Sequence, residues 1–233
     1  MPRCAMRTWA MTERDAAVMT RSGWLSRQPE PVRAEVLRRA LVEVFEPGEA
    51  FYHIGDPSGG IYGLIWGLMA VASAPGSAAP RMIHLGAPGM WTGEAPYVVG
   101  GGRVISLRAV TECRVLYLPL EAMEAMTAAD PPVARNFAQI PLMNIMTLLR
   151  LVDDLLIVDP DRRIAAVLVR IAAAVATIPL TQSEIGDLAC ATRKQVNFAL
   201  RRFAAAGWVA TGYRSVTVAD LPALAAFVAR EEG

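Results

Sequence analysis

The chain has 233 residues, of which 54% are hydrophobic and 19% charged, and its formal net charge is +1. This composition is that of a globular protein and excludes a disordered chain, while the length fits two small domains better than one large domain. The three cysteines, Cys4, Cys113 and Cys190, are far apart and odd in number, so they support neither a disulfide framework nor a zinc knuckle and fit a reducing, cytoplasmic setting.

The first 23 residues are expected to form an N-terminal tail. They carry several arginines but lack the continuous apolar stretch and the cleavage site of a secretory signal. From Trp24 to Ala40 the pattern predicts a helix, with Pro29 and Pro31 near its start and apolar residues on one face. This helix should pack on the segment that follows it.

Between Val42 and Leu118 the pattern changes to short apolar segments separated by glycines and prolines, which predicts a small antiparallel barrel or roll. The uncharged run from Pro57 to Pro80 is long enough to cross a bilayer. Glycines and prolines interrupt this run, so we interpret it as two strands joined by a turn near residues 75–79 and expect no membrane contact. The predicted strands are Val42–Phe45, Ala50–Ile54, Ile61–Ile65, Leu68–Ala72, Met82–Leu85, Val104–Val110 and Arg114–Leu118.

After the strands, the sequence predicts a short helix from Pro119 to Met126 and a longer one that begins at Pro131–Pro132 and is kinked or restarted at Pro141. The later part of the longer helix, Leu142–Val158, is apolar nearly all round. Such a helix must be buried on more than one side, either against a partner subunit or, alternatively, in the core of its own chain. We therefore expect a sensor domain at residues 24–130 and a dimerisation helix at residues 131–158.

The last part of the chain, residues 159–233, should form a separate domain. Asp159 and Pro160 are a typical N-cap and first-turn pair for a helix that reaches Ala176. At the other end, Asp220 caps a last helix that runs through Arg230.

Between these two helices, the sequence outlines a winged helix-turn-helix. The segments Thr181–Glu184 and Thr192–Gln195 are capping boxes, in which the threonine and the residue three positions later cap each other's amide groups. The segments Trp208–Ala210 and Ser215–Val218 predict two strands of a wing around a turn near Gly212. Together with the roll, these elements give the α+β fold class.

The second of these short helices is the candidate recognition helix. Its apolar residues recur at helical spacing and should face the core, which leaves a basic and polar face outward. From Asp161 to the C-terminus there are nine Lys or Arg against six Asp or Glu, a local charge of +3. The alternative is an ordinary helical hairpin with a solvated basic face. The core residues are Val196, Ala199, Leu200 and Phe203, and the candidate DNA-binding residues are Thr192, Arg193, Lys194, Gln195, Asn197, Phe198, Arg201 and Arg202.

The order helix, β-roll, long interfacial helix and winged helix-turn-helix resembles the family of the cyclic-AMP receptor protein and the fumarate and nitrate reduction regulator (CRP/FNR). Residues 47–49, 55–56, 67, 89 and 93–94 resemble the glycine landmarks of the family's roll, and Thr192–Val196 lies at the place of its recognition motif. The resemblance implies a homodimer that binds double-stranded DNA and RNA polymerase. It also implies that Arg193 contacts guanine. Phe198 departs from the family, because it stands where the cyclic-AMP receptor protein has a second arginine, and we expect it to touch a thymine methyl group instead. Cys190 stands at a turn position where the family normally has glycine.

The resemblance also marks an effector site in the roll, where nucleotide-binding members use a Gly-Glu pair and an Arg-Ser pair. Here Gly93, Glu94 and Arg103 match, but Val104 replaces the serine and cannot donate a hydrogen bond to a phosphate. The loop from Ala95 to Gly102 is a residue shorter than expected. We therefore expect an unidentified effector other than cyclic AMP, and we keep a structural Glu94–Arg103 ion pair as the alternative to ligand binding.

On the long helix, the resemblance implies that Leu148 and Leu149 stand at the positions where the cyclic-AMP receptor protein places Thr-Ser against adenine. They would leave the purine edge unpaired, at a cost of about 1–3 kcal/mol for each buried polar group. The candidate effector-binding residues are Gly93, Glu94, Ala95, Arg103, Val104, Leu148 and Leu149.

Other sensor chemistries of the family find little support. An iron–sulfur cluster needs four thiolates, and only Cys4 lies near the N-terminus. His53 and His84 are candidate haem ligands, with ordinary core or surface histidines as the alternative. We expect no metal site and no enzyme, because the sequence has no phosphate loop, Gly-x-Ser-x-Gly, His-Glu-x-x-His or dinucleotide fingerprint. A rival function is a ligand-binding or scaffold protein whose helix-turn-helix contacts protein.

Overall fold

The computed structural model describes residues 8–74, 76 and 79–229. The first seven residues of the predicted tail, including Cys4, most of the turn near residues 75–79 and Arg230 lie outside the described residues. The chain divides into two compact units, one made of Met1–Pro80 and Leu85–Met146 and the other of Arg81–His84 and Thr147–Gly233. Within the described ranges, no helix is both long enough and apolar enough to cross a bilayer.

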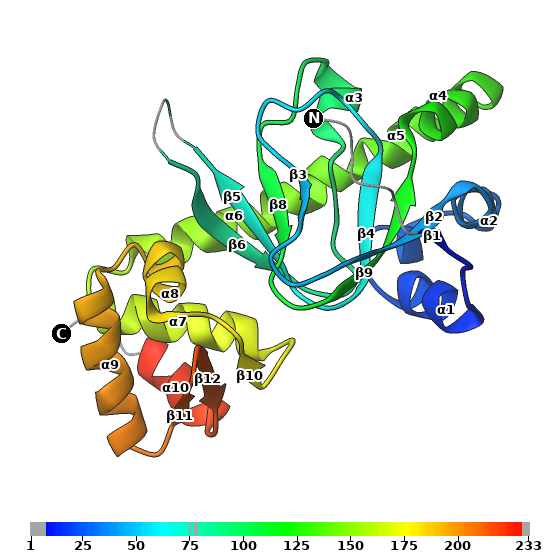
Figure 1. Cartoon of the computed structure of the whole chain (residues 1–233). Coiled ribbons are helices and arrows are strands. Elements are labelled where there is room, and N and C mark those ends of the chain that lie inside the picture. The colour runs from blue at the N-terminus through cyan, green and yellow to red at the C-terminus, as the bar shows by residue number, and fades with distance from the viewer. Residues whose placement is uncertain (1–7, 75, 77–78, 230–233) are drawn as a thin grey trace. The chain divides into compact units, whose positions relative to one another are not determined.

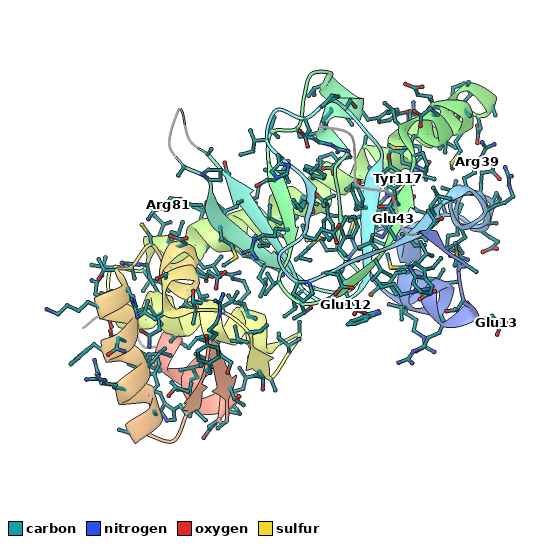
Figure 2. All side chains as sticks on the ribbon, in the orientation of Figure 1. Glu13, Arg39, Glu43, Arg81, Glu112 and Tyr117 are labelled. Atoms are coloured by element: carbon teal, nitrogen blue, oxygen red, sulfur yellow. The ribbon has the colours of Figure 1, made fainter. Side chains whose placement is uncertain are left out.

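The predicted antiparallel roll is confirmed (Figure 1). One sheet has the order β1 (Thr8–Trp9), β2 (Leu41–Phe45), β9 (Cys113–Leu118), β4 (Ile61–Trp66) and β7 (Trp91–Thr92). The other has the order β3 (Ala50–Tyr52), β8 (Ser106–Ala109), β5 (Met69–Ser73) and β6 (Arg81–Gly86). Figure 2 labels Glu43 on β2 and Tyr117 on β9, two strands that pair directly. The two-residue strands β1 and β7 were not predicted, because they are too short for an alternating pattern.

The strand predicted at Val104–Val110 begins later than expected, at Ser106 in β8. The backbone before this strand pairs with the loop at residues 55–56 and not with the sheet. The Gly55 amide donates to the Arg103 carbonyl and the Arg103 amide donates to the Asp56 carbonyl, both over 2.8 Å. Val104 therefore lies in a loop rather than in the sheet.

The N-terminal helices differ from the prediction in two ways. The predicted tail contains α1 (Glu13–Arg21), which Thr12 and Asp15 open as a capping box. The predicted helix at 24–40 is divided into a 3-10 turn (Leu25–Arg27) and α2 (Glu30–Arg39). Pro29 explains the division, because proline disfavours the helical conformation in the residue before it and has no amide hydrogen to donate.

A tryptophan from the segment between α1 and α2 is central to the core of this unit. The indole ring of Trp24 lies edge-on to Trp91 with ring centroids 5.0 Å apart and stacks on Phe137 at 5.6 Å. Its Nε1 donates to the Asn136 carbonyl over 2.6 Å. The ring therefore connects Trp91 of β7 to α5 (Val133–Phe137). The other helices of this unit's chain segment are α3 (Ala95–Val99), which lies between β7 and β8, and α4 (Leu120–Ala129) and α6 (Gln139–Leu156), which follow the roll in sequence. Helix α3 lies inside the predicted loop 95–102, so that part of the prediction was wrong.

The long helix is restarted as predicted, although α6 begins at Gln139, two residues before Pro141. Proline is tolerated there because the first turn of a helix needs no amide donor. The alternative of a helix inside the core of its own chain is wrong, since only Ile140 and Leu151 of its apolar residues are fully buried. The exposed apolar residues of α6 are Leu142, Ile145, Met146, Leu148, Leu149, Val152, Leu155 and Leu156.

The second unit has the predicted helix-turn-helix followed by a wing (Figure 1). The helix predicted to reach Ala176 ends earlier, at Ala172, and the first wing strand is shifted to Val209–Gly212. A third strand, Thr177–Ile178, was missed and pairs with the second wing strand. The elements are α7 (Pro160–Ala172), β10 (Thr177–Ile178), α8 (Gln182–Ala189), α9 (Arg193–Ala205), β11 (Val209–Gly212), β12 (Ser215–Val218) and α10 (Leu221–Val228).

Candidate nucleic-acid interface

Both predicted capping boxes are present. The Thr181 amide donates to Glu184 Oε2 over 2.8 Å, and the Glu184 amide donates to Thr181 Oγ1 over 3.2 Å. At the start of α9, the Thr192 amide donates to Gln195 Oε1 over 2.9 Å, and the Gln195 amide donates to Thr192 Oγ1 over 3.2 Å. Since these bonds satisfy amides that a helix end leaves free, they fix where α8 and α9 begin.

The turn between the two helices keeps its geometry with a cysteine in place of glycine. Cys190 is left-handed, with φ 47° and ψ 49°, and the Ala191 amide donates to the Gly186 carbonyl over 2.9 Å. A Cβ atom on Gly186 would lie 2.5 Å from the Ala191 carbonyl oxygen, so this glycine is needed for close packing. The turn therefore holds α8 against the start of α9.

Helix α9 has one buried apolar face and one exposed face, as predicted. The side chains of Val196, Ala199, Leu200 and Phe203 are all buried. The Phe203 ring lies 5.8 Å from Trp208 and 5.6 Å from Phe227, centroid to centroid, which anchors α9 to the wing and to α10. The opposite face is thereby turned to solvent, and Figure 2 shows nitrogen-tipped side chains projecting from the outer side of α9.

The structure exposes seven of the eight candidate DNA-binding residues on this outer face or at its edge. Phe198 is 61% exposed, so most of its ring is accessible from solvent. Asn197 is half-buried and its Nδ2 lies 3.3 Å from Gln182 Oε1 of α8. Arg202 differs from the prediction, because its Nη1 forms an ion pair with Asp161 Oδ2 of α7. The exposed residues are Thr192, Arg193, Lys194, Gln195, Phe198, Arg201 and Arg202.

A cleft of about 520 Å³ lies between the amino end of α8, the α9 side chains and the β11–β12 hairpin. Arg193 and Asn197 line it from α9, and Gln182 lines it from α8. The hairpin turn adds Tyr213, which is 93% exposed, and Arg214. Sequence reasoning missed Gln182, Tyr213 and Arg214 as site residues. The signals that could have found them are the helix start beside Thr181 and the short wing turn.

In the roll, the arginine that matches the effector site is turned inward. Arg103 is 3% exposed, its Nη1 donates to the Gly93 carbonyl over 2.5 Å and its Nη2 donates to the Gly60 carbonyl over 2.8 Å. Its guanidinium also lies over the Tyr52 ring, 4.2 Å from the centroid. These hydrogen bonds go to carbonyls and not to Glu94, so the alternative of a Glu94–Arg103 ion pair is wrong.

Glu94 is buried beside the start of α6. Its Oε1 accepts from Asn144 Nδ2 over 3.3 Å, and the same amide nitrogen donates to the Trp91 carbonyl over 3.2 Å. Its Oε2 has no hydrogen-bond partner among the described residues. Burial raises the pKa of Glu94, although Asn144 and Arg103 oppose that rise.

The remaining candidate effector residues do not surround this pair with polar groups. Val104 is 63% exposed on its loop, and Ala95 is the first residue of α3. Leu148 and Leu149 belong to the exposed apolar face of α6. The structure therefore brings together Gly93, Glu94 and Arg103, while the side chains of Val104, Leu148 and Leu149 offer no hydrogen-bond donor.

No group of three or more His, Cys, Asp or Glu that could hold a metal ion occurs in the described part of the chain. His53 is exposed, whereas His84 is mostly buried, and burial together with the Arg170 charge lowers the pKa of His84 to about 4.

Comparison with known proteins agrees with this architecture. The family model described as the cyclic nucleotide-binding domain matches residues 42–130, and the one described as the Crp-like helix-turn-helix domain matches residues 162–227. A CRP-like cAMP-activated global transcriptional regulator of Mycobacterium tuberculosis is 26% identical over 206 residues, which cover 84% of this chain and 92% of that protein. The chain belongs to the CRP/FNR family of transcription regulators, as the sequence resemblance predicted.

Solved structures share the fold at low sequence identity. A transcriptional regulator of the CRP family from Thermus thermophilus has a TM-score of 0.68 at 23% identity, covering 80% of this chain and 96% of that chain. The c-di-GMP responsive global regulator CLP from Xanthomonas campestris has a TM-score of 0.64 at 17% identity, covering 82% of this chain and 99% of that chain. The effectors named for the M. tuberculosis and X. campestris relatives differ, so the shared fold does not by itself identify an effector.

Proposed function

We propose that two copies of this chain bind a pseudo-palindromic DNA duplex through α9, and that this binding does not require cyclic AMP. The observation that carries the proposal is the exposed basic and polar face of α9, which a doubly capped helix-turn-helix holds beside the wing. In this proposal the protein acts in the cytoplasm on DNA and meets RNA polymerase there, as the family relationship implies.

The outer face of α9 offers the chemistry needed to read a major groove. The Arg193 guanidinium can donate two hydrogen bonds to the O6 and N7 atoms of guanine, and Phe198 can contact a thymine methyl group. Lys194 and Arg201 supply charges for phosphates, while Thr192, Gln195 and Asn197 supply polar groups for phosphates or base edges. Arg202 is left out of this set because it already pairs with Asp161.

The exposed apolar face of α6 supports a dimer. Leu142, Ile145, Leu149, Val152 and Leu156 are separated by steps of three and four residues, and each of them is exposed in the single chain. This spacing is that of the contact positions in a two-stranded coiled coil. Helix α6 of a second copy of this chain would pack against these residues and bury them.

The interior of the roll supports an effector other than cyclic AMP. A cyclic phosphate needs donors, but Arg103 is 3% exposed and already donates one N–H of Nη1 and one of Nη2 to the carbonyls of Gly93 and Gly60. The neighbouring Val104 offers no side-chain donor, and the leucines at 148 and 149 offer no partner for a purine edge. We therefore infer that this chain does not use the nucleotide named for its M. tuberculosis relative.

The proposal is tested by selecting bound duplexes from a random DNA pool at fixed moderate salt, with and without cyclic AMP. We expect the same palindrome in both arms. Recovery only with the nucleotide would contradict our interpretation of Arg103 and Val104. The absence of any enriched sequence, with no salt-sensitive duplex binding, would favour the rival in which the helix-turn-helix contacts protein.

The dimer is tested by sedimentation of Leu149→Glu, which places a charge in the centre of the proposed seam. We expect this variant to be a monomer, because a buried unpaired carboxylate is strongly unfavourable. The matched control is Arg150→Glu, a change at the next, exposed residue of α6 that lies off the seam. A dimer in the first variant, or a monomer in the control, would contradict this part of the proposal.

A further inference from the structure

One arginine near the start of α7 connects the carboxyl ends of two other helices. The Arg163 Nη1 donates to the carbonyls of Ile157 over 2.7 Å and Val158 over 2.8 Å, the two residues directly after α6. Its Nε donates to the Ala189 carbonyl over 3.0 Å, and its Nη2 reaches the Cys190 carbonyl over 3.4 Å, at the end of α8. A single side chain thus bridges four backbone carbonyls.

These carbonyls lie at or just beyond the ends of α6 and α8, where the helices no longer supply amide donors. The last carbonyls of a helix have no amide donor within the helix and carry a partial negative charge. A guanidinium presents five N–H donors in a rigid plane, so it can satisfy carbonyls on two sides at once. A lysine at the same position would keep the charge but could not hold both helix ends in one geometry.

A second contact holds α6 to α7. Arg170 Nε donates to Asp154 Oδ2 over 2.9 Å, and both side chains are largely buried. Only Ile157–Asp159 connects the two helices, and the Asp159 side chain caps α7 by accepting from the Asp161 amide over 3.0 Å. The end of α6, the start of α7 and the end of α8 therefore form one joint, from which the turn at Cys190 leads directly into α9.

We propose that Arg163 fixes the orientation of α9 relative to α6, and thereby sets the spacing between the two DNA half-sites that a dimer accepts. This inference rests on the proposed function, because α6 must be the dimer seam and α9 the DNA-reading helix. One added base pair moves a half-site along the duplex and turns it by about 35°, since a helical turn has 10–10.5 base pairs. A stiff joint excludes such a displaced half-site, whereas a loose joint accommodates it.

The test compares wild type and Arg163→Lys on the palindrome selected by the wild type. Duplexes have the original spacing, one base pair more or one fewer, and a single half-site. For the wild type we expect a loss of affinity of about tenfold or more when the spacing changes by one base pair. For Arg163→Lys we expect a loss of less than about threefold, with half-site affinity within about twofold of wild type.

Arg162→Lys is the matched control. It makes the same change one residue earlier in α7, where Arg162 Nε and Nη2 donate to the Val228 carbonyl of α10 rather than to the end of α6. This control should keep the wild-type spacing profile. Asp154→Asn is a second variant that removes the Arg170 ion pair, and it should relax the spacing preference in the same direction if Arg163→Lys does not fold.

The possible outcomes distinguish a role of Arg163 in orienting α9 from a purely structural role. An unchanged spacing profile in both joint variants, or relaxation of the control to the same extent, would overturn the inference while leaving the proposed function in place. A loss of half-site binding that parallels a lower melting temperature would also overturn it, because it would assign Arg163 a purely structural role. If the wild type selects no palindrome, the proposed function fails and this inference fails with it.

Discussion

The polar side chains at the family's effector site are turned inward, whereas those on α9 are turned outward. In the roll, Arg103 donates to the carbonyls of Gly60 and Gly93, and Glu94 accepts from Asn144. On α9, Arg193, Lys194 and Arg201 are exposed, and their side chains take part in no hydrogen bond or ion pair within the described residues. A site whose donors are used by its own backbone stabilises the fold, while a site whose donors are free can bind a partner.

The two regions also differ in what their glycines do. In the roll, Gly93 has φ 99°, and a Cβ atom there would lie 2.8 Å from Arg103 Nη1, so the glycine admits the arginine itself. In the helix-turn-helix, Gly186 admits the backbone of the turn that positions α9. The same property therefore closes a site in one region and positions an open surface in the other.

Replacing Arg103 should have the largest effect on stability. Arg103→Met leaves the buried carbonyls of Gly60 and Gly93 without donors, which costs about 1–3 kcal/mol for each of them, so we expect a total loss of roughly 2–6 kcal/mol in the free energy of unfolding. Chemical denaturation measures this loss, and Arg38→Met, which breaks an exposed ion pair with Glu35, should leave the free energy of unfolding nearly unchanged. A stable Arg103→Met variant that loses a response to cyclic AMP would show instead that Arg103 binds the nucleotide and does not stabilise the fold.

The corresponding change on the open surface should leave the fold intact. Arg193→Ala removes a bidentate base contact worth about 1–3 kcal/mol, so we expect roughly 10- to 100-fold weaker operator binding and relaxed preference at one base pair. Its melting temperature should not change. Gel-shift titration and calorimetry check both statements.

Arg202→Ala is the matched control on the same helix. It breaks the ion pair with Asp161, so it should lower the stability of this domain while the selected base sequence stays the same. If Arg202→Ala changes the base preference and Arg193→Ala does not, the assignment of the two arginines is wrong.

The predictability of each region follows from the range of the interactions that form it. The buried face of α9 and both capping boxes depend on residues three or four positions apart, so the sequence alone was sufficient to predict them. The inward orientation of Arg103 depends on Gly60, which is distant in sequence, and no local pattern marks that pairing. The ion pair of Arg202 with Asp161 was missed for the same reason.

Short and mixed elements form a second group of errors. Helix α1 has a capping box from Thr12 to Asp15, yet its many charges gave it the pattern of a tail. The division of the predicted helix 24–40 at Pro29 could have been predicted, because two prolines two residues apart restrict where a helix can begin. The strands β7 and β10 have two residues each, which is shorter than any periodicity that a sequence can show.

The ion pair between Asp15 of α1 and Arg114 of β9 should make the stability of the protein depend on pH. Arg114 donates to Asp15 over 2.9 Å and 2.8 Å, and this hydrogen bonding lowers the pKa of Asp15 from 3.8 to about 2. Since the pKa is lower in the folded state, the stabilisation is complete above pH 3.8 and is lost as the pH falls to about 2. We expect it to contribute on the order of 1–2 kcal/mol at pH 7.

Asp15→Asn should therefore be less stable than wild type at pH 7 and nearly as stable at pH 2. Calorimetry across this range measures the difference between the two proteins. Glu13→Gln, a change at an exposed residue of the same helical turn, should follow the wild type throughout. A difference between Asp15→Asn and wild type that is independent of pH would show that the carboxylate charge is not responsible.

The smallest change in stability is expected from Cys190, the strained residue in the turn between α8 and α9. A residue other than glycine in the left-handed conformation costs about 1–2 kcal/mol, and Cys190 has φ 47°. Glycine removes this strain but gives the unfolded chain more freedom, which offsets about 0.4–1 kcal/mol. Cys190→Gly should therefore stabilise the protein by roughly 0.5–1 kcal/mol without changing operator affinity, because the thiol is exposed and Arg163 binds only the backbone carbonyl of this residue. Denaturation measures the stability, and a less stable variant would mean that the exposed thiol makes a stabilising contact. Weaker DNA binding at unchanged stability would mean that DNA binding depends on the stiffness of this turn.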